Sequence, residues 1–128
     1  MFMKTGIKEK KENTLRLTFS DKLEIPVKEG IFQCALADVI RIASDGSYST
    51  VYVAGGRRYV ISKGLKDYEE LLPEKDFFRV HKSHLVNIHK IAKYVRTDGS
   101  FLEMEDGSLI EVARRKKEEF FQRMNARI

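Results

Sequence analysis

The stretch FFRVHKSHLVNIHK, at residues 77–90, contains every histidine of the chain and no acidic residue. Its histidines and cations are Arg79, His81, Lys82, His84, His89 and Lys90. Side chains of these types support three kinds of chemistry. Histidines bind metals or act as general acids and bases, and cations bind anions. The spacing of these residues and their sequence neighbours discriminate among the three.

The spacing of the histidines does not favour a metal site. His81, His84 and His89 follow one another at offsets of three and five residues, with no cysteine nearby. Zinc sites commonly use two histidines four residues apart on a helix, or paired cysteine and histidine ligands. We therefore expect no metal and no other cofactor.

An enzyme active site is not indicated either. A histidine base needs a nucleophile and an orienting carboxylate, or a glycine loop that binds phosphate. Ser83 is close to the histidines, but the sequence has no Gly-x-Ser-x-Gly motif and no Gly-x-x-x-x-Gly-Lys loop. We expect no catalytic residues, and a metal-dependent enzyme that uses the histidines is kept only as an alternative.

Anion binding explains the stretch better. Its apolar residues are expected in the core: Val80, Leu85, Val86 and Ile88. The remaining hydrogen-bond donors have no acidic residue near them in the sequence: Arg79, His81, Lys82 and Ser83. A segment rich in donors suits phosphate oxygens and base edges.

A second basic segment, ARRKKEEFF, stands near the C-terminus. It is predicted to place Arg114, Arg115, Lys116 and Lys117 in the first turn of the last helix. Cations at that end oppose the helix dipole, at roughly 0.3–1 kcal/mol each when exposed. A solvated charged face is the simpler explanation of one such run, but a bound anion would relieve the conflict. Two basic segments in one small domain favour nucleic acid.

Composition sets the remaining limits. The chain has 128 residues, 42% of them apolar and 34% charged, which suits one globular domain. Its net charge of +5 favours polyanionic partners only weakly. No apolar run is long enough to span a membrane, and no signal peptide is visible, so we expect a cytoplasmic protein. The single cysteine, Cys34, is expected to be a small buried side chain.

The pattern of turns and alternating residues predicts a mostly β fold. Three Asp-Gly pairs and Gly55-Gly56 separate short alternating runs, as in successive hairpins. Strands are expected at 31–36, 39–43, 48–53, 58–62, 91–97, 100–105 and 109–112, with one or two more near the start. Helices are expected at 65–72 and 114–124. Residues 1–20 are interpreted as an N-terminal tail or the remnant of a linker, and residues 21–128 as the domain.

These motifs closely resemble the LytTR family of bacterial DNA-binding domains, from about Lys22 to Met124. The resemblance rests on the pattern Arg-x-His-x-Ser-x-x-x-Asn at 79–87 and on the later segment IEVARRKK. It implies elongated, antiparallel β-sheets built from hairpins, with two or three short helices. It also implies a transcriptional regulator that inserts loops into successive major grooves of double-stranded DNA and reads its sequence.

The resemblance assigns roles to individual residues. Base contacts are implied for Tyr48, Lys82 and Arg114. Phosphate contacts are implied for His81, Ser83, Arg115 and Lys116, and we add Arg79 from its place in the donor-rich segment. Two positions depart from the family pattern, because Ala113 replaces a common serine and Ala43 a frequent acidic residue.

The resemblance also suggests partners. Family members commonly bind paired repeats as two copies, so a dimer on DNA is expected. Many carry the domain behind a receiver or sensory domain, which this chain does not contain. An RNA- or protein-interaction module that uses the same basic face is the alternative. Binding of single strands needs exposed aromatic rings, whereas Phe77, Phe78 and Tyr94 are expected in the core.

Overall fold

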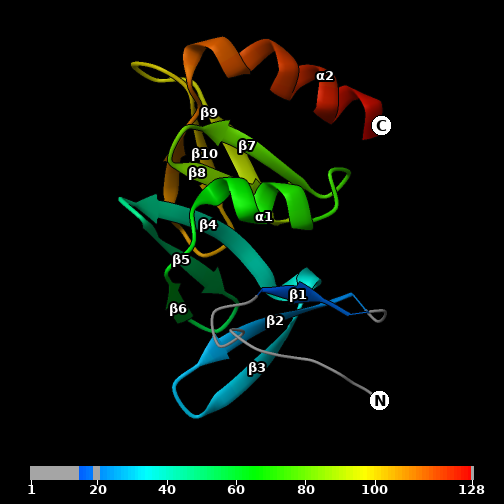
Figure 1. The fold of residues 1–128 in the computed structure, drawn as a ribbon. Coiled ribbons are helices and arrows are strands. Elements are labelled where there is room, and N and C mark those ends of the chain that lie inside the picture. Colours follow the sequence, from blue (N-terminus) through cyan, green and yellow to red (C-terminus); the bar gives the residue numbers. More distant parts are fainter. Residues whose placement is uncertain (1–14, 19–20, 128) are drawn as a thin grey trace.

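The computed structural model of the protein describes residues 15–18 and 21–127, with side chains through residue 125. It confirms a mostly β fold with antiparallel sheets and two α-helices, as expected (Figure 1). Arg16–Leu17, inside the predicted tail, forms an edge strand, and the rest of that segment except Leu15 and Thr18 lies outside the described residues. None of the described helices is long and apolar enough to cross a membrane.

The strands form three sheets. The first contains β1 (Arg16–Leu17), β2 (Lys22–Val27) and β3 (Gly30–Ala35) in sequence order. The central sheet has the order β6-β5-β4-β8-β7 and comprises β4 (Val39–Asp45), β5 (Tyr48–Val53), β6 (Arg57–Ile61), β7 (Phe77–His81) and β8 (His84–Asn87). The third, ordered β11-β10-β9, comprises β9 (Ile91–Val95), β10 (Phe101–Met104) and β11 (Leu109–Glu111).

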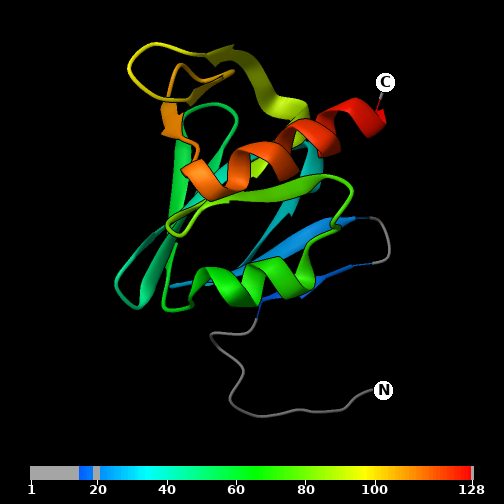
Figure 2. The same ribbon diagram turned by 90° about the horizontal axis from the view of Figure 1, so that it is seen from above.

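Helices connect and cover the sheets. The α-helices are α1 (Leu65–Leu71) and α2 (Lys117–Arg127), and the short 3-10 turns are η2 (Leu36–Asp38), η3 (Ile88–Lys90) and η4 (Arg114–Lys116). In both views β7 runs between α1 and α2 (Figures 1 and 2). The basic segment therefore differs from the prediction, because Arg114–Lys116 form a 3-10 turn and the α-helix begins only at Lys117.

The two faces of the central sheet bury separate cores. One core packs the first sheet and α1 against the central sheet and includes Ile25, Val51 and Tyr68. The other packs the third sheet and α2 against it and includes Val80 and Phe120. The predicted core residues of the 77–90 stretch are all buried: Val80, Leu85, Val86 and Ile88. Cys34 is also buried, and burial raises its pKa to about 11, as an inert structural thiol requires.

Candidate nucleic-acid interface

Three segments that are distant in the sequence lie at one edge of the molecule. They are the β4–β5 turn at 45–48, the β7–β8 turn at 81–84 and η4, and we call them the interface turns. The N–H of Ser44 donates to the carbonyl of Ser83 at 3.0 Å, and the N–H of Ala113 donates to the carbonyl of Val80 at 2.8 Å. These two bonds connect all three interface turns, which lie on the left in Figure 1.

The β7–β8 turn is built without glycine. Lys82 and Ser83 separate the paired residues His81 and His84, and the strand register shifts between Arg79 and His81. Such a shift is a β-bulge, which bends the strand and redirects its side chains. The carbonyl of Val80, inside the bulge, is the one that accepts the bond from Ala113. The bulge therefore brings η4 next to the turn.

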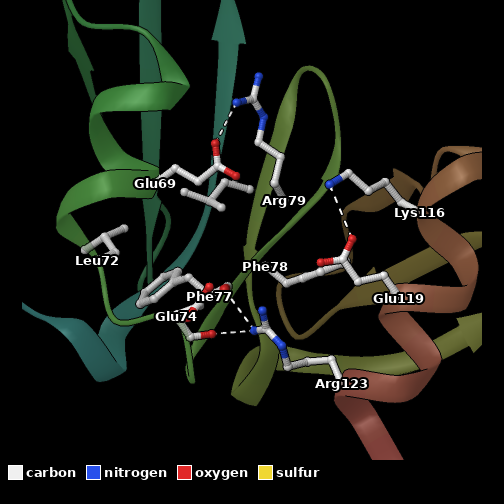
Figure 3. Close-up of a pocket in the computed structure, with 10 residues that line it drawn as sticks. Glu69, Leu72, Glu74, Phe77, Phe78, Arg79, Lys116, Glu119 and Arg123 are labelled. Atoms are coloured by element: carbon white, nitrogen blue, oxygen red, sulfur yellow. Dashed lines mark hydrogen bonds and ion pairs between the residues drawn. The ribbon is translucent and has the colours of Figure 1, made fainter.

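Side chains complete this turn. Arg79 Nε donates to the carbonyl of His81 at 3.4 Å, and Arg79 Nη2 donates to the carbonyl of Lys82 at 2.5 Å. Arg79 Nη1 donates to Glu69 Oε1 on α1 at 2.9 Å, an ion pair visible in Figure 3. The guanidinium of Arg79 thus points into the protein's own loop and helix, so its predicted phosphate contact is not needed to explain its position.

His81 is held in one tautomer. Its Nδ1 accepts a hydrogen bond from the N–H of Ser83 at 3.0 Å, so the neutral ring carries its hydrogen on Nε2. Nε2 lies 3.7 Å from Glu111 Oε1 on β11. A neutral His81 can therefore still donate to an anion from Nε2.

His84, by contrast, is partly buried and turns its Nδ1 into the protein. Its Nδ1 is buried and has no hydrogen-bond partner among the described residues. Burial chiefly, together with His81 and Arg41, lowers the pKa of His84 to about 4, and Glu111 opposes the shift. The ring centroids of His81 and His84 are 5.3 Å apart. No group of potential metal ligands occurs in the described part of the chain.

The three cations of η4 differ in whether they have an ionic partner among the described residues. Lys116 Nζ lies 3.6 Å from Glu119 Oε1 and 5.7 Å from the centre of the Phe78 ring, and Figure 3 shows these three side chains among those that line one pocket. Arg114 and Arg115 are exposed and form no ion pair with any residue that the structure describes. The turn is anchored by α2, where Phe120 is buried and Arg123 donates to the carbonyls of Glu74 and Phe77.

A hollow of about 230 Å³ lies between the β7–β8 turn and η4. Its lining includes five of the predicted site residues: Arg79, His81, Lys82, Arg115 and Lys116. Tyr48, Ser83 and Arg114 do not line it. Tyr48 begins β5, directly after the turn of Gly46, and its side chain is 52% exposed at the same edge. The interface turns thus hold all the predicted site residues except Arg79, which lies on β7 two residues before His81.

The sequence missed two carboxylates that belong to this region. Two residues of the stretch do have acidic neighbours in space, since Glu69 binds Arg79 and Glu111 faces His81. These acids stand on α1 and β11, far from 77–90 in the sequence, so no local pattern could reveal them. Glu119 binds Lys116 three residues earlier, and this pairing was visible from helical spacing. Lys82, Arg114 and Arg115 remain without an ionic partner in the described residues.

The comparisons with known proteins agree with this geometry. The family described as LytTr DNA-binding domain matches residues 29–125. Two curated relatives are the heme-containing CO-sensing transcriptional regulators RcoM 1 and RcoM 2 of Paraburkholderia xenovorans (strain LB400). Each is 34% identical over 92 residues, which cover 70% of this chain. The matched part covers only 34% of the length of each relative.

A solved structure supports the fold. It is the LytTr DNA-binding domain of a Bacillus cereus protein described as a methyl-accepting/DNA response regulator. The TM-score is 0.72 at 20% identity, over 81% of this chain and 96% of that one. At this identity the likeness concerns the fold alone. The family match over residues 29–125 shows that the chain belongs to the LytTR family of DNA-binding domains.

Proposed function

We propose that this domain is a transcriptional regulator that binds double-stranded DNA in a sequence-specific way and inserts its interface turns into successive major grooves. One observation carries the proposal. Lys82, Arg114 and Arg115 are exposed, have no ionic partner in the described residues, and lie on turns that hydrogen bonds connect. Unpaired cations on neighbouring protrusions are what a polyanion with two grooves requires.

We assign the base contacts to residues at the tips of the turns. Lys82 projects from the two-residue β7–β8 turn, and Arg79 binds the carbonyls of His81 and Lys82. Arg114 is the first residue of η4, and its guanidinium can bind guanine O6 and N7 with two parallel hydrogen bonds. Tyr48 supplies an exposed ring and hydroxyl from the β4–β5 turn. In our proposal, Lys82, Arg114 and Tyr48 read bases from three separate turns.

We assign the phosphate contacts to the residues beside these tips. His81 offers its Nε2 hydrogen while Nδ1 is occupied by the N–H of Ser83. Because the neutral ring is already a donor, this contact with phosphate does not require a proton on Nδ1. The hydroxyl of Ser83 and the cations Arg115 and Lys116 complete the proposed set. Lys116 would exchange its contact with Glu119 for one with phosphate.

The aromatic side chains favour duplex DNA over a single-stranded partner. Phe77 and Phe78 are buried, and Tyr94 packs partly buried against Phe120. Among the described residues of the interface turns, the exposed aromatic residue is Tyr48. A platform that stacks successive bases needs several exposed rings.

We further propose that the domain acts in the cytoplasm, as a pair of copies on repeated sites and under the control of a receiver or sensory domain. The curated relatives extend well beyond the matched part, and their names describe them as sensing regulators. Sedimentation of the domain on DNA with one and with two half-sites would measure the number of bound copies. A single copy on the two-site duplex would contradict the paired arrangement.

The central test is selection from a randomised duplex DNA pool at about 150 mM salt, where non-specific contacts are weakened. Wild type is compared with Lys82→Ala, Arg114→Ala and the control Lys75→Ala, which removes an exposed cation at the opposite end of β7. We expect one short motif, relaxed at a different position by each of the first two variants and unchanged by the control. Recovery of no motif from the wild type would overturn the proposal.

A further inference from the structure

We propose that Arg79 and Glu69 determine sequence specificity without contacting DNA, because they fix the position of the base-reading turn that carries Lys82. The inference rests on the proposed function and deepens it. It assigns Arg79 a positioning role in place of the predicted phosphate contact, and it gives a role to an acidic residue on α1. Neither role follows from the sequence motif.

The turn needs support from outside itself. Two-residue hairpin turns normally adopt conformations with positive φ, which favour glycine and asparagine. Lys82 and Ser83 are neither, and both have negative φ, unlike Asp21 and Asp98, the non-glycine residues with positive φ in the described part of the chain. The backbone of the turn is instead held by the guanidinium of Arg79, which binds the carbonyls of His81 and Lys82.

Arginine suits this position for a geometric reason. A guanidinium presents its donors in a rigid planar fork, whereas a lysine ammonium is a flexible point charge. Arg79 uses the fork in three directions, toward His81, Lys82 and Glu69. Lysine at this position would keep the charge and lose the simultaneous contacts.

Glu69 fixes the orientation of the fork. Its carboxylate stands on α1, and α1 is packed into the core through Leu65 and Tyr68. The side chains of Arg79 and Glu69 are 25% and 43% exposed, so water partly screens the pair. Figure 3 shows Glu69 on α1 paired with Arg79. The helix thus determines where the guanidinium lies, and the guanidinium determines where the turn lies.

The position of Lys82 is what this chain of contacts controls. Its own carbonyl accepts the bond from Arg79, so any movement of the guanidinium moves the Cα from which the side chain projects. Lysine is a long, flexible donor with little directional preference of its own. Its choice of base must therefore come from the point at which its stem begins.

The sign of the charge makes the inference testable. Removal of Glu69 makes a basic DNA-binding protein more positive, so simple electrostatics predicts tighter binding to every duplex. The positioning role predicts a loss of specific binding. Glu70, the next residue of α1, is also exposed and has no ion pair with a described residue, so Glu70→Ala removes the same charge without touching Arg79.

The experiment compares wild type, Glu69→Ala, Glu70→Ala and Arg79→Lys with two readouts. The first is amide hydrogen exchange of Ser83 in the free protein, since this N–H donates to His81 inside the turn. The second is the ratio of affinities for the selected site and for the site changed at the base pair that Lys82→Ala relaxes. Binding to an unrelated duplex and its salt dependence are recorded in parallel.

For Glu69→Ala and Arg79→Lys we expect faster exchange at Ser83 and a discrimination ratio reduced about three- to tenfold, with an unchanged salt slope. Glu70→Ala should match wild type in both readouts. Equal behaviour of Glu69→Ala and Glu70→Ala would overturn the inference while the proposed function stands. If the wild type discriminates between no duplexes, the proposed function fails, and the inference about specificity fails with it.

Discussion

Two of the interface turns each connect a pair of antiparallel strands through two residues, but their backbones are held in different ways. In the β4–β5 turn, Gly46 adopts a φ of +66°, and the turn lies between the paired residues Asp45 and Tyr48. In the β7–β8 turn, Lys82 and Ser83 occupy the equivalent position with no glycine, and Arg79 binds two of its carbonyls. The first turn is specified by its own residues, and the second depends on a distant helix through Glu69.

The difference matters for function. A turn that is specified locally keeps its shape when its surroundings change, because glycine removes the steric obstacle to positive φ. A turn held by tertiary contacts changes when those contacts change, so it can couple the reading of a base to the packing of α1. The comparison predicts that substitutions outside the turn should affect β7–β8 and leave β4–β5 unaffected.

The largest effect on stability is expected from Arg79→Met. The change leaves Glu69 and the carbonyls of His81 and Lys82 without their donor, and charged hydrogen bonds of this kind contribute about 2 kcal/mol together at a partly exposed site. Urea denaturation should show this loss, and Lys75→Met should be close to neutral. A free energy of unfolding equal to that of wild type would mean that the β7–β8 turn is specified locally after all.

A smaller effect is expected from Gly46→Ala in the other turn. A Cβ at this position would meet open space, so the cost arises only from the positive φ and amounts to about 1 kcal/mol. The neighbouring exposed substitution Ser47→Ala should be nearly neutral. Amide exchange at Ser83 should remain at the wild-type rate in Gly46→Ala. Faster exchange there would show that the two turns are not independent.

The same contrast explains which parts of the structure the sequence could predict. The Asp-Gly pairs specify their own hairpins, so the β4–β5 turn and its strands were predicted correctly. The β7–β8 turn was not predicted, since Lys82-Ser83 carries no turn signal and its support comes from Arg79 and α1. The partnership of His81 with Glu111 was equally hidden, because the packing of the third sheet against the central sheet brings them together.

The cations of the site illustrate the same limit. Basic residues in two segments predicted an anion-binding surface, and the family resemblance gave their order. The sequence could not separate Arg79, whose guanidinium binds its own loop, from Lys82, whose ammonium has no ionic partner in the described residues. That separation depends on where Glu69 lies, and no local pattern places the helix that carries Glu69 beside the 77–90 stretch.

The smallest expected effect is a loss of folding stability at mildly acidic pH. The folded state lowers the pKa of His84 to about 4 from its ordinary value of 6.5, mainly through burial. Between these values the unfolded chain binds a proton that the folded chain excludes, so stability falls as the pH falls below 6.5 and is constant above it. The groups facing His84 are His81, Arg41 and Glu111, and Glu111 reduces the shift.

We expect a loss of about 0.5 kcal/mol between pH 7 and pH 6, after allowance for the part of the ring that water reaches. Because His84 closes the β7–β8 turn, the protection of the Ser83 amide, measured relative to an unfolded peptide at the same pH, should also fall over this range. The β4–β5 turn contains no histidine, and the protection of its amides should not change. His84→Phe keeps an aromatic ring beside His81 and removes the titration. Identical pH profiles for wild type and His84→Phe would show that acid does not reach the interface through this residue.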